Sequence, residues 1–220
     1  QFFTRAVDFG YSKTAAETFT KWPHDTILSD MVWVIRNFKP DIIITRFPAD
    51  ERAGHGHHTA SAMLAEEAFA AAADPTKFPE QLIYVSVWQA QRLFWNNSTW
   101  WDKDLPNKIA NGAPELAVFD VEGYNTLLGK SYGEIAAESR TNHKSQGFGS
   151  TPTRGEQKEY LELKKGTAIQ NSDIFSGIQL GWERYRQGAD IQNTINSIIS
   201  NYNIMQPEKS NDELNKIYGQ

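Results

Sequence analysis

Three of the chain's five histidines stand within four residues of one another, in the run His55-Gly56-His57-His58. Imidazole nitrogens are common ligands of zinc, and a catalytic zinc site usually combines three protein ligands with one water molecule. The spacing lets one histidine bind a metal ion while another faces the open coordination position. It therefore favours a metal site over the alternative, an exposed polar loop at a helix N-terminus, and His57 is the member most easily turned away from such a site.

The elements on either side of the histidines should hold them at the edge of a sheet. The run 41–47 is apolar and β-branched, which predicts a strand buried on both faces in a parallel sheet. An alanine-rich stretch from about His57 to Ala73 predicts a helix that ends at Asp74-Pro75. Ligands of open α/β sheets bind just beyond the carboxyl ends of such strands. The histidines therefore lie where chemistry is usually found.

The rest of the chain alternates between helical and strand patterns without an internal repeat. We predict an α/β fold that is partial Rossmann-like, with a mostly parallel sheet, flanking helices and a helical C-terminal extension. We expect one domain over residues 1–150 and a helical extension with a linker over 151–220. The expected helices span 14–22, 26–38 with Asp25 as N-cap, 131–143 with a Ser131–Glu134 capping box, 156–165 and 189–202, and a further element starts over 211–218. The expected strands span 82–88, 91–95 and 115–121, with a loop over 96–113.

Composition excludes several classes of protein. The chain has 220 residues, a net charge of −5 and no block of like charges, which argues against a nucleic-acid partner. No apolar run approaches the roughly 18 residues of a membrane span. The absence of cysteine excludes disulfides and thiolate ligands. It is compatible with a cytoplasmic or an exported bacterial protein, and we favour export to the periplasm or the medium.

Two motifs together resemble a known enzyme family. The first is the strand DIIIT, a short acidic loop and the run GHGHHTASA, and the second is the strand ELAVFDV, a helix and the run His143-Lys144-Ser145-Gln146. In this order and spacing they resemble the second half of the PIG-L/LmbE-like zinc deacetylases, over roughly residues 26–147. The resemblance implies an amide hydrolase that removes N-acetyl groups from an amino-sugar conjugate.

The resemblance also implies roles for individual residues. His58 would be a zinc ligand, and His55 would be catalytic, polarising the amide carbonyl or stabilising the oxyanion as an imidazolium. Zinc would lower the pKa of its bound water toward 7. The substrate-binding residues would be Asp50, Arg52, His143 and Gln146. From the residues alone, His143 is as well explained by a favourable position at a helix C-terminus, and the pair Asp50 and Arg52 by an ordinary loop ion pair.

One departure from the family is large. Its A-H-P-D-D-E signature, which supplies the other histidine, the ligating aspartate and the base, has no counterpart in this chain. We therefore expect a fragment that is inactive alone and that is completed by a missing N-terminal segment or a second chain. Two alternatives remain open: a carbohydrate-binding relative without catalysis, and a different metallohydrolase that uses carboxylates of this chain.

Overall fold

The computed structural model describes residues 1–146, 148–186 and 188–218. The chain divides into two compact units, Gln1–Ile174 and Phe175–Gln220. No helix in the described part of the chain is long and apolar enough to cross a membrane. The first unit contains the sheet and the candidate site.

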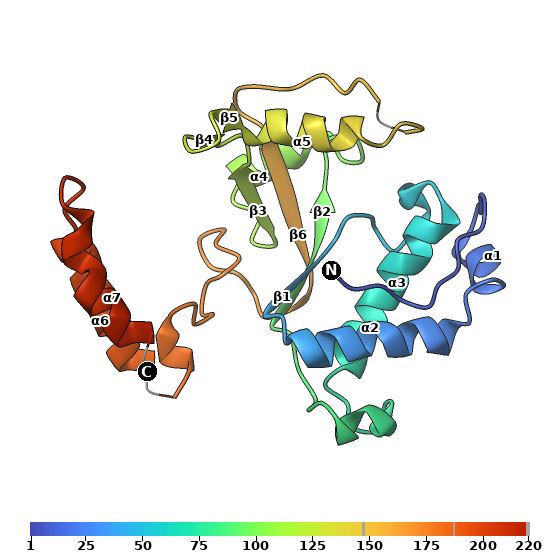
Figure 1. Cartoon of the computed structure of the whole chain (residues 1–220). Coiled ribbons are helices and arrows are strands. Elements are labelled where there is room, and N and C mark those ends of the chain that lie inside the picture. Colours follow the sequence, from blue (N-terminus) through green and yellow to red (C-terminus); the bar gives the residue numbers. More distant parts are fainter. Residues whose placement is uncertain (147, 187, 219–220) are drawn as a thin grey trace. The chain divides into compact units, whose positions relative to one another are not determined.

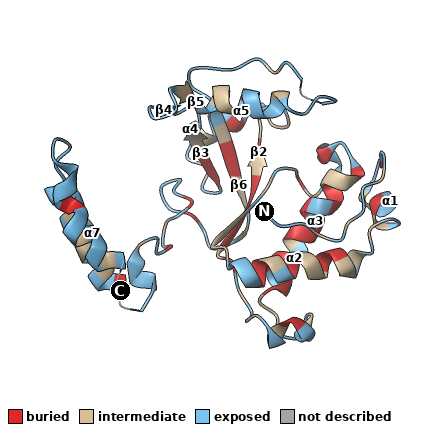
Figure 2. Cartoon of the chain, viewed as in Figure 1, coloured by how far each residue is buried: buried red, intermediate tan, exposed pale blue. Residues whose placement is uncertain are grey.

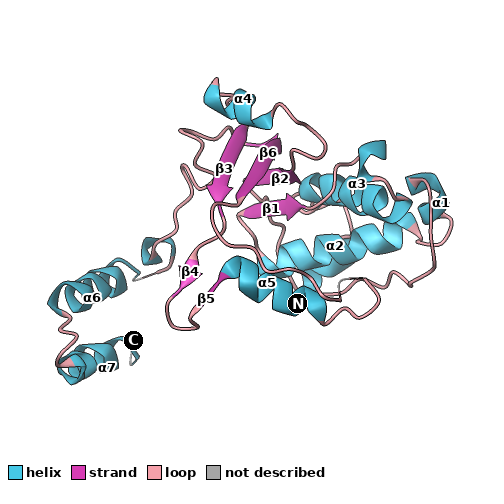
Figure 3. Cartoon of the chain, turned by 90° about the horizontal axis from the view of Figure 1, so that it is seen from above, coloured by secondary structure: helices cyan, strands magenta, loops and turns pink. Residues whose placement is uncertain are grey.

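A four-stranded mixed sheet forms the centre of the first unit (Figures 1 and 3). Its strand order is β1 (Ile42–Thr45), β2 (Arg92–Asn97), β6 (Lys158–Gly166) and β3 (Leu116–Asp120). Only β1 and β2 pair in parallel, whereas β6 is antiparallel to both β2 and β3. The α/β class is confirmed, but the expected mostly parallel sheet is wrong.

Three predicted elements differ from the structure. The segment predicted as helix 156–165 is instead the strand β6, which lies between β2 and β3. Hydrogen bonding to the backbones of these two strands outweighs the helical preference of the lysines and glutamates in β6. The predicted strand 82–88 contains the end of the 3₁₀ helix η2 (Pro79–Ile83) and then a turn and an irregular segment. The expected loop 96–113 includes the helix α4 (Leu105–Ala110).

The prediction that β1 is buried on both faces is also wrong. Ile44 is 51% exposed, because β1 lies at one end of the strand order and has a single neighbour among the described residues. Ile43 does pack against the helices, and Ile42 packs on the opposite face of the sheet. The apolar run thus forms a strand as predicted, but an edge strand.

Two helices cover one face of the sheet. They are α2 (His24–Phe38) and α3 (Gly56–Ala71), and the short α1 (Ala15–Phe19) packs against α3. The small buried side chains of α3 allow close approach, so the buried faces of α2 and α3 meet in the core (Figure 2). Its buried members are Ile27, Leu28, Val32, Ile35, Leu64, Ala68, Ala71 and Ala72. The N-cap of α2 is Pro23, and Asp25 lies in the first turn instead of capping it.

A buried arginine joins α2 to the segment after α3. Arg36 is fully buried, and its guanidinium donates hydrogen bonds to six acceptors at 2.8–3.3 Å. A buried charge is tolerated only where its donors are satisfied. The acceptors are the carbonyls of Ala71, Ala72, Asp74, Lys77 and Phe78 and the Gln81 side-chain oxygen.

The segment between β3 and β6 contains a small hairpin and a helix. The hairpin strands are β4 (Tyr124–Asn125) and β5 (Lys130–Ser131), and the helix is α5 (Tyr132–Thr141). The predicted capping box is confirmed, because the Ser131 hydroxyl accepts from Glu134 N while the Glu134 carboxylate accepts from Ser131 N. The capping box therefore defines the start of α5.

The second unit consists of helical segments. These are η3 (Trp182–Arg184), α6 (Gly188–Asn201), η4 (Pro207–Ser210) and α7 (Asn211–Tyr218). The helix predicted over 189–202 is confirmed as α6, and the element expected over 211–218 is the helix α7. The expected extension over 151–220 therefore begins later. Its first part, as far as Ile174, includes β6 and belongs to the first unit.

Candidate histidine site

The three histidines lie at the N-terminus of α3, beyond the carboxyl end of β1. After β1 the chain forms the 3₁₀ helix η1 (Glu51–Ala53) and then enters α3. His55 is the N-cap of α3, with an extended backbone, and its side chain is exposed. The histidines are therefore placed where the sequence predicted them to be.

Two of the histidines belong to one stack of parallel rings. The His58 ring stacks on Phe47 with centroids 3.7 Å apart and on His55 with centroids 5.1 Å apart, and the planes differ by only 5° and 7°. Phe47 and His55 have no ring contact with each other among the described residues, which puts the His58 imidazole between them. A ring therefore stacks on each face of this imidazole, and its nitrogens lie at the uncovered edge of the stack.

A backbone carbonyl orients the His58 imidazole further. Nδ1 of His58 lies 3.2 Å from the carbonyl oxygen of Ala53, so this nitrogen carries the proton and donates it. Nε2 has no hydrogen-bond partner among the described side chains and backbone groups. Metal-binding histidines commonly donate their second ring N–H to a carbonyl in this way. His58 thus has the tautomer and the support of a ligand.

His57 points away from this stack. Its Nδ1 lies 2.9 Å from the hydroxyl of Ser12, which lies 2.8 Å from the hydroxyl of Thr18. Phe9 stacks on the His57 ring at 4.3 Å. The side chain therefore anchors residues 9–18 onto the first turn of α3, as expected for the histidine that is turned away.

Asp50 and Arg52 bind each other. The guanidinium Nε and Nη2 of Arg52 donate to the two carboxylate oxygens of Asp50 at 2.9 and 2.7 Å. Hydrogen bonding to Arg52 lowers the pKa of Asp50. Arg52 also lies over the Trp95 ring at 4.9 Å, and its carbonyl accepts from Trp101 Nε1 at 2.8 Å. In this arrangement the pair fixes the loop that presents His55 and His58.

His143 and Gln146 lie in the turn after α5, where both are exposed. His143 N donates to the Arg140 carbonyl and Gln146 N donates to the His143 carbonyl. Both bonds join residues three positions apart, as is common where a helix ends. No hydrogen bond or ring contact among the described residues joins them to His55 or His58. Their predicted role in substrate binding stays a prediction.

Three residues of this site were missed by sequence reasoning. Phe47 supports His58, Tyr11 meets the His55 ring edge to face at 4.9 Å, and Ser12 binds His57. Phe47 is the last residue of the apolar run 41–47, and this position at the start of the loop is a signal that could have found it. Tyr11 and Ser12 reach the site only through tertiary contacts.

The described residues offer one ligand for a catalytic zinc ion and not a full set. No group of three or more histidine, aspartate or glutamate side chains in the described ranges comes together to hold a metal. His58 fits as a ligand because its Nδ1 faces the Ala53 carbonyl and its Nε2 has no hydrogen-bond partner among the described residues. Further ligands would have to come from outside these residues.

Comparison with known proteins adds no relative: no family model, curated protein or solved structure matches this chain.

Proposed function

We propose that the chain is part of a zinc-dependent de-N-acetylase that hydrolyses the N-acetyl amide of an amino-sugar conjugate. One observation carries this proposal. His58 donates its Nδ1 proton to the Ala53 carbonyl at 3.2 Å and keeps Nε2 open at the edge of the stack. The resemblance of the GHGHH and HKSQ runs to the PIG-L/LmbE-like deacetylases supplies the reaction class.

His55 has the second role. It is exposed beside His58 at the N-terminus of α3, where unpaired backbone N–H groups favour negative charge. An oxyanion that develops during amide hydrolysis is best stabilised by donors that are already in place. His55 would donate a hydrogen bond to that oxygen, and His58 would hold the metal.

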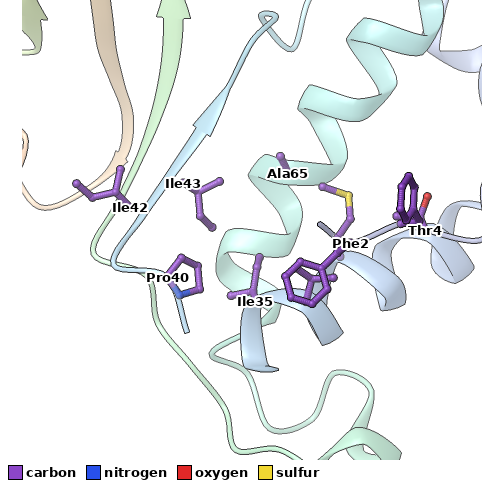
Figure 4. Close-up of a pocket in the computed structure, with 10 residues that line it drawn as sticks. Phe2, Thr4, Ile35, Pro40, Ile42, Ile43 and Ala65 are labelled. Carbon is purple, nitrogen blue, oxygen red and sulfur yellow. The ribbon is translucent and has the colours of Figure 1, made fainter. Parts of the chain in front are cut away.

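We further propose that the fold is a partial Rossmann-like domain and that a missing N-terminal segment or a second chain completes it. β1 is an edge strand in the described sheet, and unpaired strand edges tend to bind another strand. An apolar pocket of about 340 Å³ lies beside β1, lined by residues 2–4, by α2 and by Ala65 of α3 (Figure 4). Such a segment would cover β1 and bring the ligands that these residues lack.

A second candidate is a carbohydrate-binding relative without catalysis. It is favoured by the aromatic rings that surround the histidines, because exposed rings stack on sugars whether or not a reaction follows. Zinc content and acetate release separate the two candidates in the same protein.

The deciding experiment compares three variants of the full-length parent protein. His58→Ala should lose bound zinc. His55→Ala should keep zinc and lose turnover by about 10²-fold or more. His57→Ala is the matched control, because this imidazole binds Ser12, and it should keep zinc.

Three results would contradict the proposal. Equal zinc loss from His55→Ala and His58→Ala would reverse the assignment of roles. Loss from His57→Ala alone would move the ligand to that residue. Saccharide binding without zinc and without acetate release would favour the non-catalytic candidate.

A further inference from the structure

The histidine site lies within a longer row of aromatic and imidazole rings. Each ring contacts the next at centroid distances between 3.7 and 6.0 Å, and the two end rings are exposed by 60% and 75%. The row is Tyr11, His55, His58, Phe47, Trp101 and Trp100. The members come from three separate segments of the chain, which only the fold brings together.

The Tyr11 end is held firmly by its neighbour. Ser12 is fully buried, its carbonyl accepts from Gly56 N at 2.9 Å, and its hydroxyl binds both His57 and Thr18. A Cβ at Gly56 would overlap the Thr14 carbonyl oxygen and lie 2.7 Å from the Ser12 hydroxyl. The loop thus packs directly on the α3 backbone, and Tyr11 is presented next to His55 in a defined position.

The Trp100 end is held by a turn. Trp100 N donates to the Ser98 hydroxyl at 3.2 Å and Trp101 N donates to the Ser98 carbonyl at 2.9 Å. Trp101 is also tied to the Arg52 carbonyl. Trp100 therefore lies fixed beside Trp101 with most of its side chain open to solvent.

Three cationic side chains beside the row are paired. Arg52 binds Asp50, Lys108 binds Asp102, and Arg46 contacts Asn96 and Glu159. Single-stranded nucleic acids also stack on aromatic rows, but they need cations left over for their phosphates. These paired cations and the net charge of −5 suit a neutral ligand better than a polyanion. A neutral ligand that has apolar ring faces and many hydroxyl groups is a saccharide.

We propose that the row from Tyr11 to Trp100 binds a neutral saccharide of two or more linked rings, with one ring at the histidines and others at the exposed end residues. This inference rests on the proposed function only in taking a sugar at the histidine site. It adds that substrate length matters and that Tyr11 and Trp100 are binding residues outside the reacting centre.

Calorimetric titration of the full-length parent with tri-N-acetylchitotriose and with N-acetylglucosamine tests the proposal. Tyr11→Ala and Trp100→Ala should each weaken trisaccharide binding by about fivefold and leave monosaccharide binding within about twofold. Trp100→Tyr should retain most of the trisaccharide affinity, because it keeps a ring. Trp33→Ala, on α2, is the control and should change neither affinity.

Unchanged trisaccharide binding in both alanine variants would overturn the proposal, and so would equal losses for both ligands. Acetate release, measured in parallel, keeps the two proposals separate. Length-dependent binding without acetate release would sustain the aromatic row and contradict the hydrolase. Acetate release without length-dependent binding would support the hydrolase and contradict the aromatic row as a binding site.

Discussion

The imidazole of His58 and the ring of Phe47 lie face to face, 3.7 Å apart and within 5° of parallel. This contact links the end of β1 to the first turn of α3. Together with the Ala53 carbonyl, it leaves the imidazole a single orientation. Phe47 is thus a positioning residue for the proposed ligand.

We expect Phe47→Leu to loosen His58 without unfolding the protein. A leucine keeps much of the apolar contact but loses the stacking, which is worth roughly 0.5–1.5 kcal/mol. Nitrogen-15 spectra of the histidine rings should show a broadened or averaged His58 signal. Phe19→Leu, next to His24, is the control. A sharp and unshifted His58 signal in Phe47→Leu would show that the carbonyl alone is sufficient.

Gly56→Ala should destabilise the protein although alanine is the better helix former. The added Cβ meets the Thr14 carbonyl and the Ser12 hydroxyl, so the loop or the helix must move. Overpacking of this kind costs about 1–3 kcal/mol, against a propensity gain of about 1 kcal/mol. Thermal unfolding measures the net effect. At Gly10 a Cβ would meet nothing within 4 Å, so Gly10→Ala should be close to neutral.

The stability contributed by His24 should fall as pH rises. Hydrogen bonding to Asp25 raises the pKa of His24, and the charge of Glu67, 3.0 Å from Nε2, adds to this. A histidine whose pKa is raised by folding stabilises the folded state fully below its unfolded-state pKa of about 6.5. This stabilisation is lost as pH rises through the folded-state pKa. His24→Gln should therefore lower the Tm at about pH 5 and have little effect at about pH 9. An equal loss at both values would assign the effect to packing.

Replacement of Arg36 should be among the most damaging single changes. Arg36→Met leaves six acceptors without their donor in a fully buried position. We expect a loss of about 3 kcal/mol or more in the free energy of unfolding. Arg5→Met removes the pair that the exposed Arg5 guanidinium forms with Asp30 and should cost much less than Arg36→Met. Similar losses from both would mean that the buried network contributes little.

His143→Ala and Gln146→Ala should leave stability within about 1 kcal/mol, since both side chains are exposed. If they face substrate in the proposed deacetylase, either change should raise KM or lower kcat. Lys144→Ala, between them, is the control. A large stability loss with unchanged kinetics per folded molecule would leave them a structural role only.

The local signals of the sequence determined much of this protein. Periodicity and end signals located α2, α3, α5 and α6, because each depends on residues within a few turns of one another. The apolar run before the loop and the histidine spacing placed His55, His57 and His58 at the start of α3, beyond β1. The α/β class followed from the same patterns.

Only the tertiary structure decided the sheet and the surroundings of the histidines. The segment rich in lysine and glutamate at 158–166 became β6 because two distant strands left a gap of backbone donors and acceptors for it. Local patterns also do not show which residues contact His57 and His58, because Ser12 and Phe47 reach them through tertiary contacts. Local patterns report which backbone shape a segment prefers. Pairing and side-chain contacts between distant segments depend on the free energy of the whole folded chain, which no short window contains.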